Sequence, residues 1–147
     1  MILVRPILPE EASEAKLLIL AGLEERWGEL NEELNQDLDH LVSARFEGAF
    51  LVAVEDGSIL GTGALSVSGR DAEIARMSVS AGSRRRGIGS AILDALVGEA
   101  RARGCKRCTL ETTASWSDAR AFYVANGFRL VAEDGNEATF ALDVQHP

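Results

Sequence analysis

The sequence is organised around residues 72–103, AEIARMSVSAGSRRRGIGSAILDALVGEARAR. In the first part of this stretch the larger apolar residues are Ile74, Met77 and Val79. Set among small residues, they are typical of a strand that is covered on both faces. Apolar residues then recur at the spacing of an amphipathic helix, at Ile88, Ile92, Leu93, Leu96, Val97 and Ala100. Gly104 follows, where helices often end in a left-handed residue. The stretch therefore predicts a strand that leads into a helix through a glycine turn.

The turn itself, residues 83–90 (SRRRGIGS), has the composition of an anion-binding site. The first backbone N–H groups of a helix have no internal partner, and the helix dipole places partial positive charge there. Gly87 and Gly89 lack a Cβ, so a phosphate can approach the amides closely, and the arginines add charge. The sequence predicts a pyrophosphate cradle made of Arg84, Arg85, Arg86, Gly87, Ile88, Gly89 and Ser90.

Two familiar phosphate loops do not fit this turn. A Walker loop needs a Lys directly after its last glycine, and a Rossmann turn needs a third glycine where this chain has Ile92. The turn does match the pattern R/Q-x-x-G-x-G/A of the GNAT superfamily of acyl-CoA N-acyltransferases. Its fixed positions are Arg84, Gly87 and Gly89. The chain also resembles the second conserved region of that family, at Leu110, Glu111, Ala119, Tyr123, Gly127 and Phe128.

The resemblance covers residues 10–144 and implies a fold, a donor and an acceptor. The implied fold is a single α+β (α/β) domain over residues 1–147, with a mixed central sheet of six or seven strands, two parallel splayed central strands and about four helices. The implied donor is acetyl-CoA, whose pantetheine arm would contact the backbone of Met77, Ser78 and Val79. The implied acceptor is a small-molecule or peptide amine. Many members of the family dimerise, so a homodimer is an option here.

Acetyl transfer to an amine needs a base for the ammonium and an acid for the departing thiolate. Tyr123 is the only tyrosine, and it matches the general acid of the family. Glu111 stands where some members carry a carboxylate base, and Glu73 is the alternative. The position seven residues before Tyr123, commonly Asn in the family, is Trp116 here, so any contact made by that amide is lost.

Composition sets the outer bounds. The chain has 147 residues, 46% hydrophobic and 26% charged, which suits one globular domain with one core. No apolar run approaches a membrane span, and the N-terminus lacks a secretory pattern, so we expect a cytoplasmic protein without a membrane partner. The formal net charge of −8 argues against a nucleic-acid partner. Acidic residues concentrate in the first 60 residues, where they either attract a cationic substrate or form a solvated helix face.

Metal binding is not expected. Cys105 and Cys108 form a lone CxxC at the start of a predicted strand, without a second pair. The two histidines, His40 and His146, have no soft ligand near them in sequence. Cysteine nucleophile chemistry is disfavoured as well, because no His is placed to activate Cys108.

The rest of the chain predicts the supporting elements. A short strand at 2–5 precedes a helix that opens at Pro9, and a helical pattern continues over residues 24–44 with a break at Gly28. Strands at 50–55 and 58–67 are joined by Asp56-Gly57, a strong hairpin signal. Gly61 and Gly63 suggest a bulge or a close backbone approach.

Beyond the central helix, residues 107–113 form a strand that should run parallel to 72–80. Ser115 and Asp118 have the pattern of a capping box for the next helix, which ends at Asn126-Gly127. A second hairpin, 128–132 with 138–142, closes the chain.

The sequence is compatible with three functions, which differ in how well they fit. The leading hypothesis is an acetyl-CoA-dependent N-acetyltransferase that uses direct attack in a ternary complex. The alternative is a non-catalytic acyl-CoA-binding sensor with the same cradle. An RNA-binding role for the three arginines is disfavoured, because the chain is otherwise acidic and lacks an aromatic stacking platform.

Overall fold

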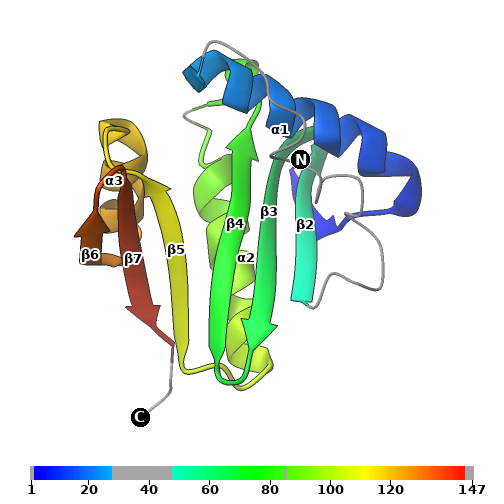
Figure 1. The fold of residues 1–147 in the computed structure, drawn as a ribbon. Coiled ribbons are helices and arrows are strands. Elements are labelled where there is room, and N and C mark those ends of the chain that lie inside the picture. The colour runs from blue at the N-terminus through cyan, green and yellow to red at the C-terminus, as the bar shows by residue number, and fades with distance from the viewer. Residues whose placement is uncertain (1, 28–47, 85, 145–147) are drawn as a thin grey trace.

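The computed structural model describes residues 2–27, 48–84 and 86–144, which form one mixed β-sheet with helices on both faces (Figure 1). The strands are β1 (Leu3–Pro6), β2 (Gly48–Glu55), β3 (Ser58–Ser68), β4 (Asp71–Val79), β5 (Arg107–Thr113), β6 (Arg129–Asp134) and β7 (Glu137–Asp143). The α-helices of the described residues are α1 (Ala12–Trp27), α2 (Ile88–Ala102) and α3 (Ser117–Ala125). The strand order in the sheet is β1-β2-β3-β4-β5-β7-β6.

The sheet is antiparallel except at its centre, where β4 and β5 run parallel and α2 makes the crossover between them. This confirms the expected mixed sheet of six or seven strands with two parallel central strands. About four helices were expected, and the described residues contain three α-helices. The helical pattern expected at residues 24–44 lies largely outside the described residues, as does the break at Gly28.

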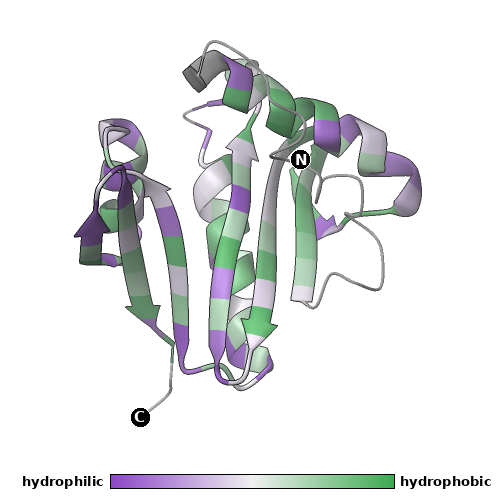
Figure 2. Cartoon of the chain, in the orientation of Figure 1, coloured by the Kyte–Doolittle hydropathy of each residue, from purple (hydrophilic) through white to green (hydrophobic). Residues whose placement is uncertain are grey.

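Two hairpins flank the central pair as expected. Asp56 and Gly57 have φ angles of 51° and 80°, which suits the two-residue turn that matches the twist of β2 and β3. At the other end β6 and β7 pair antiparallel, and β7 inserts between β6 and β5. Every residue of β6 is exposed, and Figure 2 shows this edge strand as largely hydrophilic.

The two faces of the sheet carry separate cores. On one face α1 packs Ala15, Ile19 and Leu20 against β2 and β3. On the other face α2 buries the apolar side predicted from its spacing, and α3 contributes Tyr123 to the same cluster. Full burial of each large aliphatic side chain contributes about 1.5–3 kcal/mol, so these contacts hold α2 firmly on the sheet.

The close approach predicted for the β3 glycines is confirmed at Gly63. A Cβ at this position would lie 2.6 Å from Cγ2 of Ile92 and 2.8 Å from Cδ1 of Leu96. Only glycine therefore lets α2 sit this close to β3. β3 also holds one extra residue, Leu60, opposite the step from Ala53 to Val54 of β2, so the predicted bulge is present next to Gly61.

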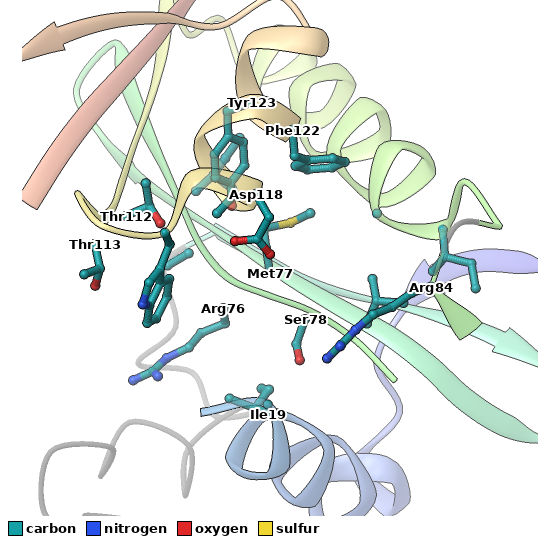
Figure 3. A pocket seen from close by; sticks show the side chains of 18 of the residues that line it. Ile19, Arg76, Met77, Ser78, Arg84, Thr112, Thr113, Asp118, Phe122 and Tyr123 are labelled. Atoms are coloured by element: carbon teal, nitrogen blue, oxygen red, sulfur yellow. The ribbon is translucent and has the colours of Figure 1, made fainter. Parts of the chain in front are cut away.

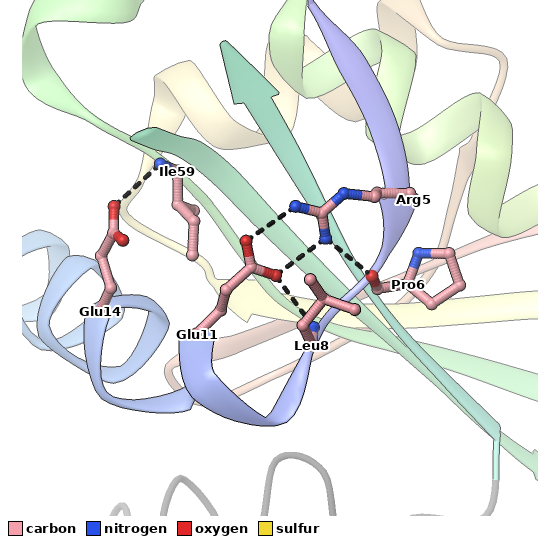
Figure 4. Close-up of polar contacts among 6 residues, drawn as sticks. All are labelled: Arg5, Pro6, Leu8, Glu11, Glu14 and Ile59. Atoms are coloured by element: carbon pink, nitrogen blue, oxygen red, sulfur yellow. Dashed lines mark hydrogen bonds and ion pairs between the residues drawn. The ribbon is translucent and has the colours of Figure 1, made fainter. Parts of the chain in front are cut away.

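Polar contacts fix the start of α1 against the sheet (Figure 4). The Arg5 guanidinium donates two hydrogen bonds of 2.8 Å to the Glu11 carboxylate, which also accepts one of 2.9 Å from the Leu8 N–H. The Arg5 hydrogen bond lowers the pKa of Glu11. Glu14 accepts a hydrogen bond of 2.9 Å from the Ile59 N–H on β3. These contacts hold α1 in place on its face of the sheet.

Three further observations concern the cysteines, metal ligands and membrane spans. Cys105 and Cys108 are buried free cysteines, and burial, aided by the charge of Cys105, raises the pKa of Cys108 to about 11. Within the described ranges no three His, Cys, Asp or Glu side chains are grouped as a metal site would require. None of the described helices is long and apolar enough to cross a membrane.

Candidate active site

The site begins where the two parallel strands part. Pairing between β4 and β5 is limited to Asp71–Ile74 of β4 and Arg107–Leu110 of β5. Beyond Ile74 and Leu110, the edges of the two strands that face each other have no strand partner among the described residues. Opposite Gly63, β4 holds two residues, Arg76 and Met77, where a regular strand would hold one. Such a bulge bends a strand and increases its twist, so it helps β4 to turn away from β5.

A pocket of about 1000 Å³ fills the region between these strands. Its walls come from β4, β5 and β7, from α1, and from α2 and α3 with the turns before them. Figure 3 shows Met77, Ser78 and Arg84 around this space with Tyr123, Phe122 and Asp118.

The N-terminus of α2 forms one end of the pocket. Its cap residue, Gly87, has a φ of 77° and makes no side-chain cap hydrogen bond. This left-handed conformation favours glycine, and a Cβ there would meet nothing within 4 Å. The first helical hydrogen bond runs from the Ala91 N–H to the Gly87 carbonyl, so the amides before Ala91 have no partner within the helix. The end of the pocket thus has the geometry of an anion cradle.

The three arginines of the turn have separate positions. Arg84 lines the pocket, whereas Arg85 lies outside the described residues. Arg86 does not line the pocket, and its guanidinium binds the Glu55 carboxylate at 2.9 Å. That hydrogen bond lowers the pKa of Glu55 and raises the pKa of Arg86. The salt bridge ties the turn to the β2–β3 hairpin.

Tyr123 reaches the pocket from α3. Its side chain is buried, and its ring centroid lies 5.3 Å from that of Phe122 and 6.1 Å from those of Phe128 and Phe140. These edge-on and tilted contacts hold the ring in one orientation at the pocket wall. The predicted helix therefore sets the position of Tyr123, and Phe128 and Phe140 from outside that helix complete its packing.

The capping box expected at the start of α3 is wrong. The helix begins at Ser117 with Trp116 as its cap residue, and no side chain makes a cap hydrogen bond. The reason is the preceding turn, which the Trp116 N–H closes by donating to the Thr113 carbonyl at 3.0 Å. Asp118 instead lines the pocket, as does Trp116.

Carboxylates gather on the β5 side of the pocket. Glu111 on β5 and Glu137 on β7 both line it, whereas Glu73 on β4 does not. The charge of Glu137 raises the pKa of Glu111, with further contributions from burial, from a hydrogen bond with Glu137 and from the charge of Glu73. A carboxylate with a raised pKa is a stronger base than an ordinary one.

One pocket thus brings together most residues that the sequence singled out. The pocket is lined by Met77, Ser78, Val79, Arg84, Gly87, Ile88, Gly89, Ser90, Glu111 and Tyr123. Sequence reasoning missed the contributions of Arg76, Asp118 and Glu137. For Arg76 a signal existed, because the apolar positions of the strand step by three residues between Ile74 and Met77 instead of two.

Comparisons with known proteins agree with this geometry. Residues 15–128 match the model of the acetyltransferase (GNAT) family. The chain is 32% identical over 118 residues to the IAA acetyltransferase of Azospirillum brasilense. This alignment covers 78% of this chain and 77% of that relative.

Two solved structures share the fold. A GNAT-family acetyltransferase from Staphylococcus aureus superposes with a TM-score of 0.89 at 19% identity, over 99% of this chain and 100% of that one. The PaiA N-acetyltransferase from Thermoplasma acidophilum, solved in complex with coenzyme A, superposes with a TM-score of 0.85 at 18% identity. That superposition covers 97% of this chain and 99% of the other. Because the family model matches residues 15–128, most of this chain, the chain belongs to the acetyltransferase (GNAT) family.

Proposed function

We propose that this protein is an acetyl-CoA-dependent N-acetyltransferase that acetylates a primary amine by direct attack in a ternary complex. One observation carries the proposal. A single pocket joins the glycine-rich start of α2 to Tyr123 and Glu111 across the gap between β4 and β5. An anchored donor and groups able to move two protons are what this reaction requires.

The described residues fit acetyl-CoA. The amides at the start of α2, with Gly87 presenting open space in place of a side chain, would hold the pyrophosphate, and Arg84 would add charge. Residues 77–79 of β4 line the pocket past the end of the β4–β5 ladder, so one edge of their backbone can bind the pantetheine amides. When bound, acetyl-CoA supplies an acetyl thioester.

Two side chains would handle the protons. Glu111 would accept the proton of the acceptor ammonium, directly or through water, and its raised pKa supports this role. Glu73 is the alternative base, although it lies outside the pocket lining. The Tyr123 hydroxyl would protonate the thiolate as it departs. The acceptor would be a small-molecule or peptide amine, and the reaction would take place in the cytoplasm.

The alternative is a non-catalytic acyl-CoA sensor built on the same cradle. Both proteins would bind coenzyme A, so binding alone does not separate them. We would incubate the protein with acetyl-CoA and a panel of amines and follow free thiol together with the acetylated amine. An enzyme releases the two in equal amounts, whereas a sensor that binds acetyl-CoA releases neither above the background rate.

A further inference from the structure

The bulge in β4 decides which way Arg76 faces. In an uninterrupted strand Arg76 would share the face of Ala72 and Ile74, which packs against α2. Here Met77 takes that face, because it packs against the same core and its Sδ lies 2.8 Å from the position of a Cβ on Gly63. Arg76 is the inserted residue, and its side chain lines the pocket.

The backbone of Arg76 is held in an unfavourable conformation. Its φ is 57°, in the left-handed region that residues other than glycine, asparagine and aspartate rarely adopt. The fully buried Thr62 hydroxyl donates a hydrogen bond of 2.8 Å to the Arg76 carbonyl. Glycine would adopt this φ without strain. An arginine at this position therefore points to a use for its side chain.

Arg76 and Arg84 lie on opposite sides of the pocket in Figure 3. Arg84 belongs to the cradle at the start of α2, whereas Arg76 lies toward Thr112 and Thr113 of β5. The pocket therefore has a second cationic group at a distance from the cradle. The same pocket is lined by Glu111, which would meet the acceptor amine.

We propose that Arg76 binds a carboxylate of the acceptor, so that the acceptor is a small amine that also carries a carboxylate, such as an amino acid. This inference rests on the proposed function. A guanidinium matches a carboxylate with two parallel N–H···O bonds, and it discriminates against neutral groups of the same shape. The carboxylates of Glu111 and Glu137 attract the ammonium of the same molecule. Thr62 is the positioning residue, since it holds the bulge from which Arg76 projects.

The first experiment compares an amino acid with its amide and with the amine that lacks the carboxylate. Wild type should acetylate the amino acid with the highest kcat/KM. Arg76→Gln should lower that value roughly 10- to 100-fold, as expected for a lost hydrogen bond to a charged group, and should leave the amide unchanged. Arg76→Lys should keep part of the activity with the amino acid, because lysine keeps the positive charge but lacks the two parallel N–H donors of the guanidinium.

Two controls accompany this comparison. Arg129→Gln removes the same charge from β6, whose residues are exposed and do not line the pocket, so it should match wild type. The affinity of each variant for acetyl-CoA, measured by calorimetry, should be unchanged, which shows that the cradle and the fold are intact. An equal loss of activity with amino acid and amide in Arg76→Gln would overturn the inference.

A second pair of variants tests the positioning role of Thr62. Thr62→Val keeps the shape of the side chain and removes the donor, so it should raise KM for the amino acid more than for the amide. The control variant Thr62→Ser keeps the hydroxyl donor, so it should keep the wild-type preference for the amino acid over the amide. If Thr62→Val folds and keeps that preference, Thr62 has no positioning role for Arg76.

A binding arm separates failure of this inference from failure of the proposed function. An N-acetylated amino acid and its N-acetylated amide are titrated into the protein with coenzyme A present. Tighter binding of the carboxylate form, lost in Arg76→Gln, supports the inference even if no amine is turned over. Equal binding of the two forms overturns it, even if neutral amines prove to be good acceptors and the proposed function stands.

Discussion

Replacing Gly89 with aspartate should weaken acetyl-CoA binding about 100-fold. Gly89 lies in the first turn of α2 and lines the pocket. A carboxylate in that turn and a pyrophosphate bound at the helix start would be separated by about one helical pitch, roughly 5 Å. Two unit charges at that distance repel by about 3 kcal/mol when the effective dielectric constant is about 20, and each 1.4 kcal/mol is a factor of ten in affinity.

A control for steric effects is needed at Gly89, because any side chain there contacts Phe122. A Cβ on Gly89 would lie 3.1 Å from Cζ of Phe122, so any side chain must push that ring aside by a few tenths of an ångström. Gly89→Ala makes the same contact without the charge, and alanine favours the helix by about 0.5–1 kcal/mol. We expect it to fold and to lose far less affinity than the aspartate variant.

The assay is calorimetric titration of acetyl-CoA into both variants at low and high salt. Because salt screens the repulsion, the gap between aspartate and alanine should narrow as ionic strength rises. Acceptor affinity should change little in either variant. Equal affinities of the two variants, or an aspartate variant that binds as well as wild type, would refute the cradle.

Three further predictions concern chemistry and stability. Tyr123→Phe keeps the ring packing, so it should leave acetyl-CoA affinity nearly unchanged and lower the single-turnover rate about 10²- to 10⁴-fold; equal rates would remove Tyr123 as the acid. Glu111→Gln should depress kcat/KM most near neutral pH and recover at high pH, where free amine accumulates; if Glu73→Gln shows that profile instead, the assignment to Glu111 is wrong. Because the pKa of Glu11 is lowered in the folded state, its bond to Arg5 stabilises the protein above the unfolded pKa of about 4.3, and this contribution disappears as pH falls through the folded pKa. The melting temperature of Glu11→Gln should therefore be lower than that of wild type at pH 7, and the difference should shrink below pH 4. A difference in melting temperature that does not change with pH would contradict the role of the Glu11 carboxylate.

The parts of the fold that depend on local spacing were predictable from sequence. The buried face of α2 follows from the recurrence of its apolar residues, and the β2–β3 hairpin follows from Asp56-Gly57. The cradle was predictable for the same reason, because glycines next to a helix start are neighbours in sequence. Its role in binding stays a prediction.

The remaining features depend on contacts between distant parts of the chain. Arg86 pairs with Glu55, 31 residues away, and no local pattern announces that pair. The bulge in β4 was visible only as an odd step between Ile74 and Met77, since it is defined by the pairing of β4 with the distant residue Gly63 of β3. The failed capping box had the right residue types, but the tight turn at Trp116 moved the start of the helix.

The central claim is that this pocket transfers an acetyl group from acetyl-CoA to an amine. The most direct measurement follows free thiol and acetylated amine together, with purified protein, acetyl-CoA and an amine panel that includes amino acids. We predict that both products appear in equal amounts and that Tyr123→Phe slows both in single-turnover experiments. Tight binding of acetyl-CoA with no thiol released for any amine would contradict the claim and favour the sensor.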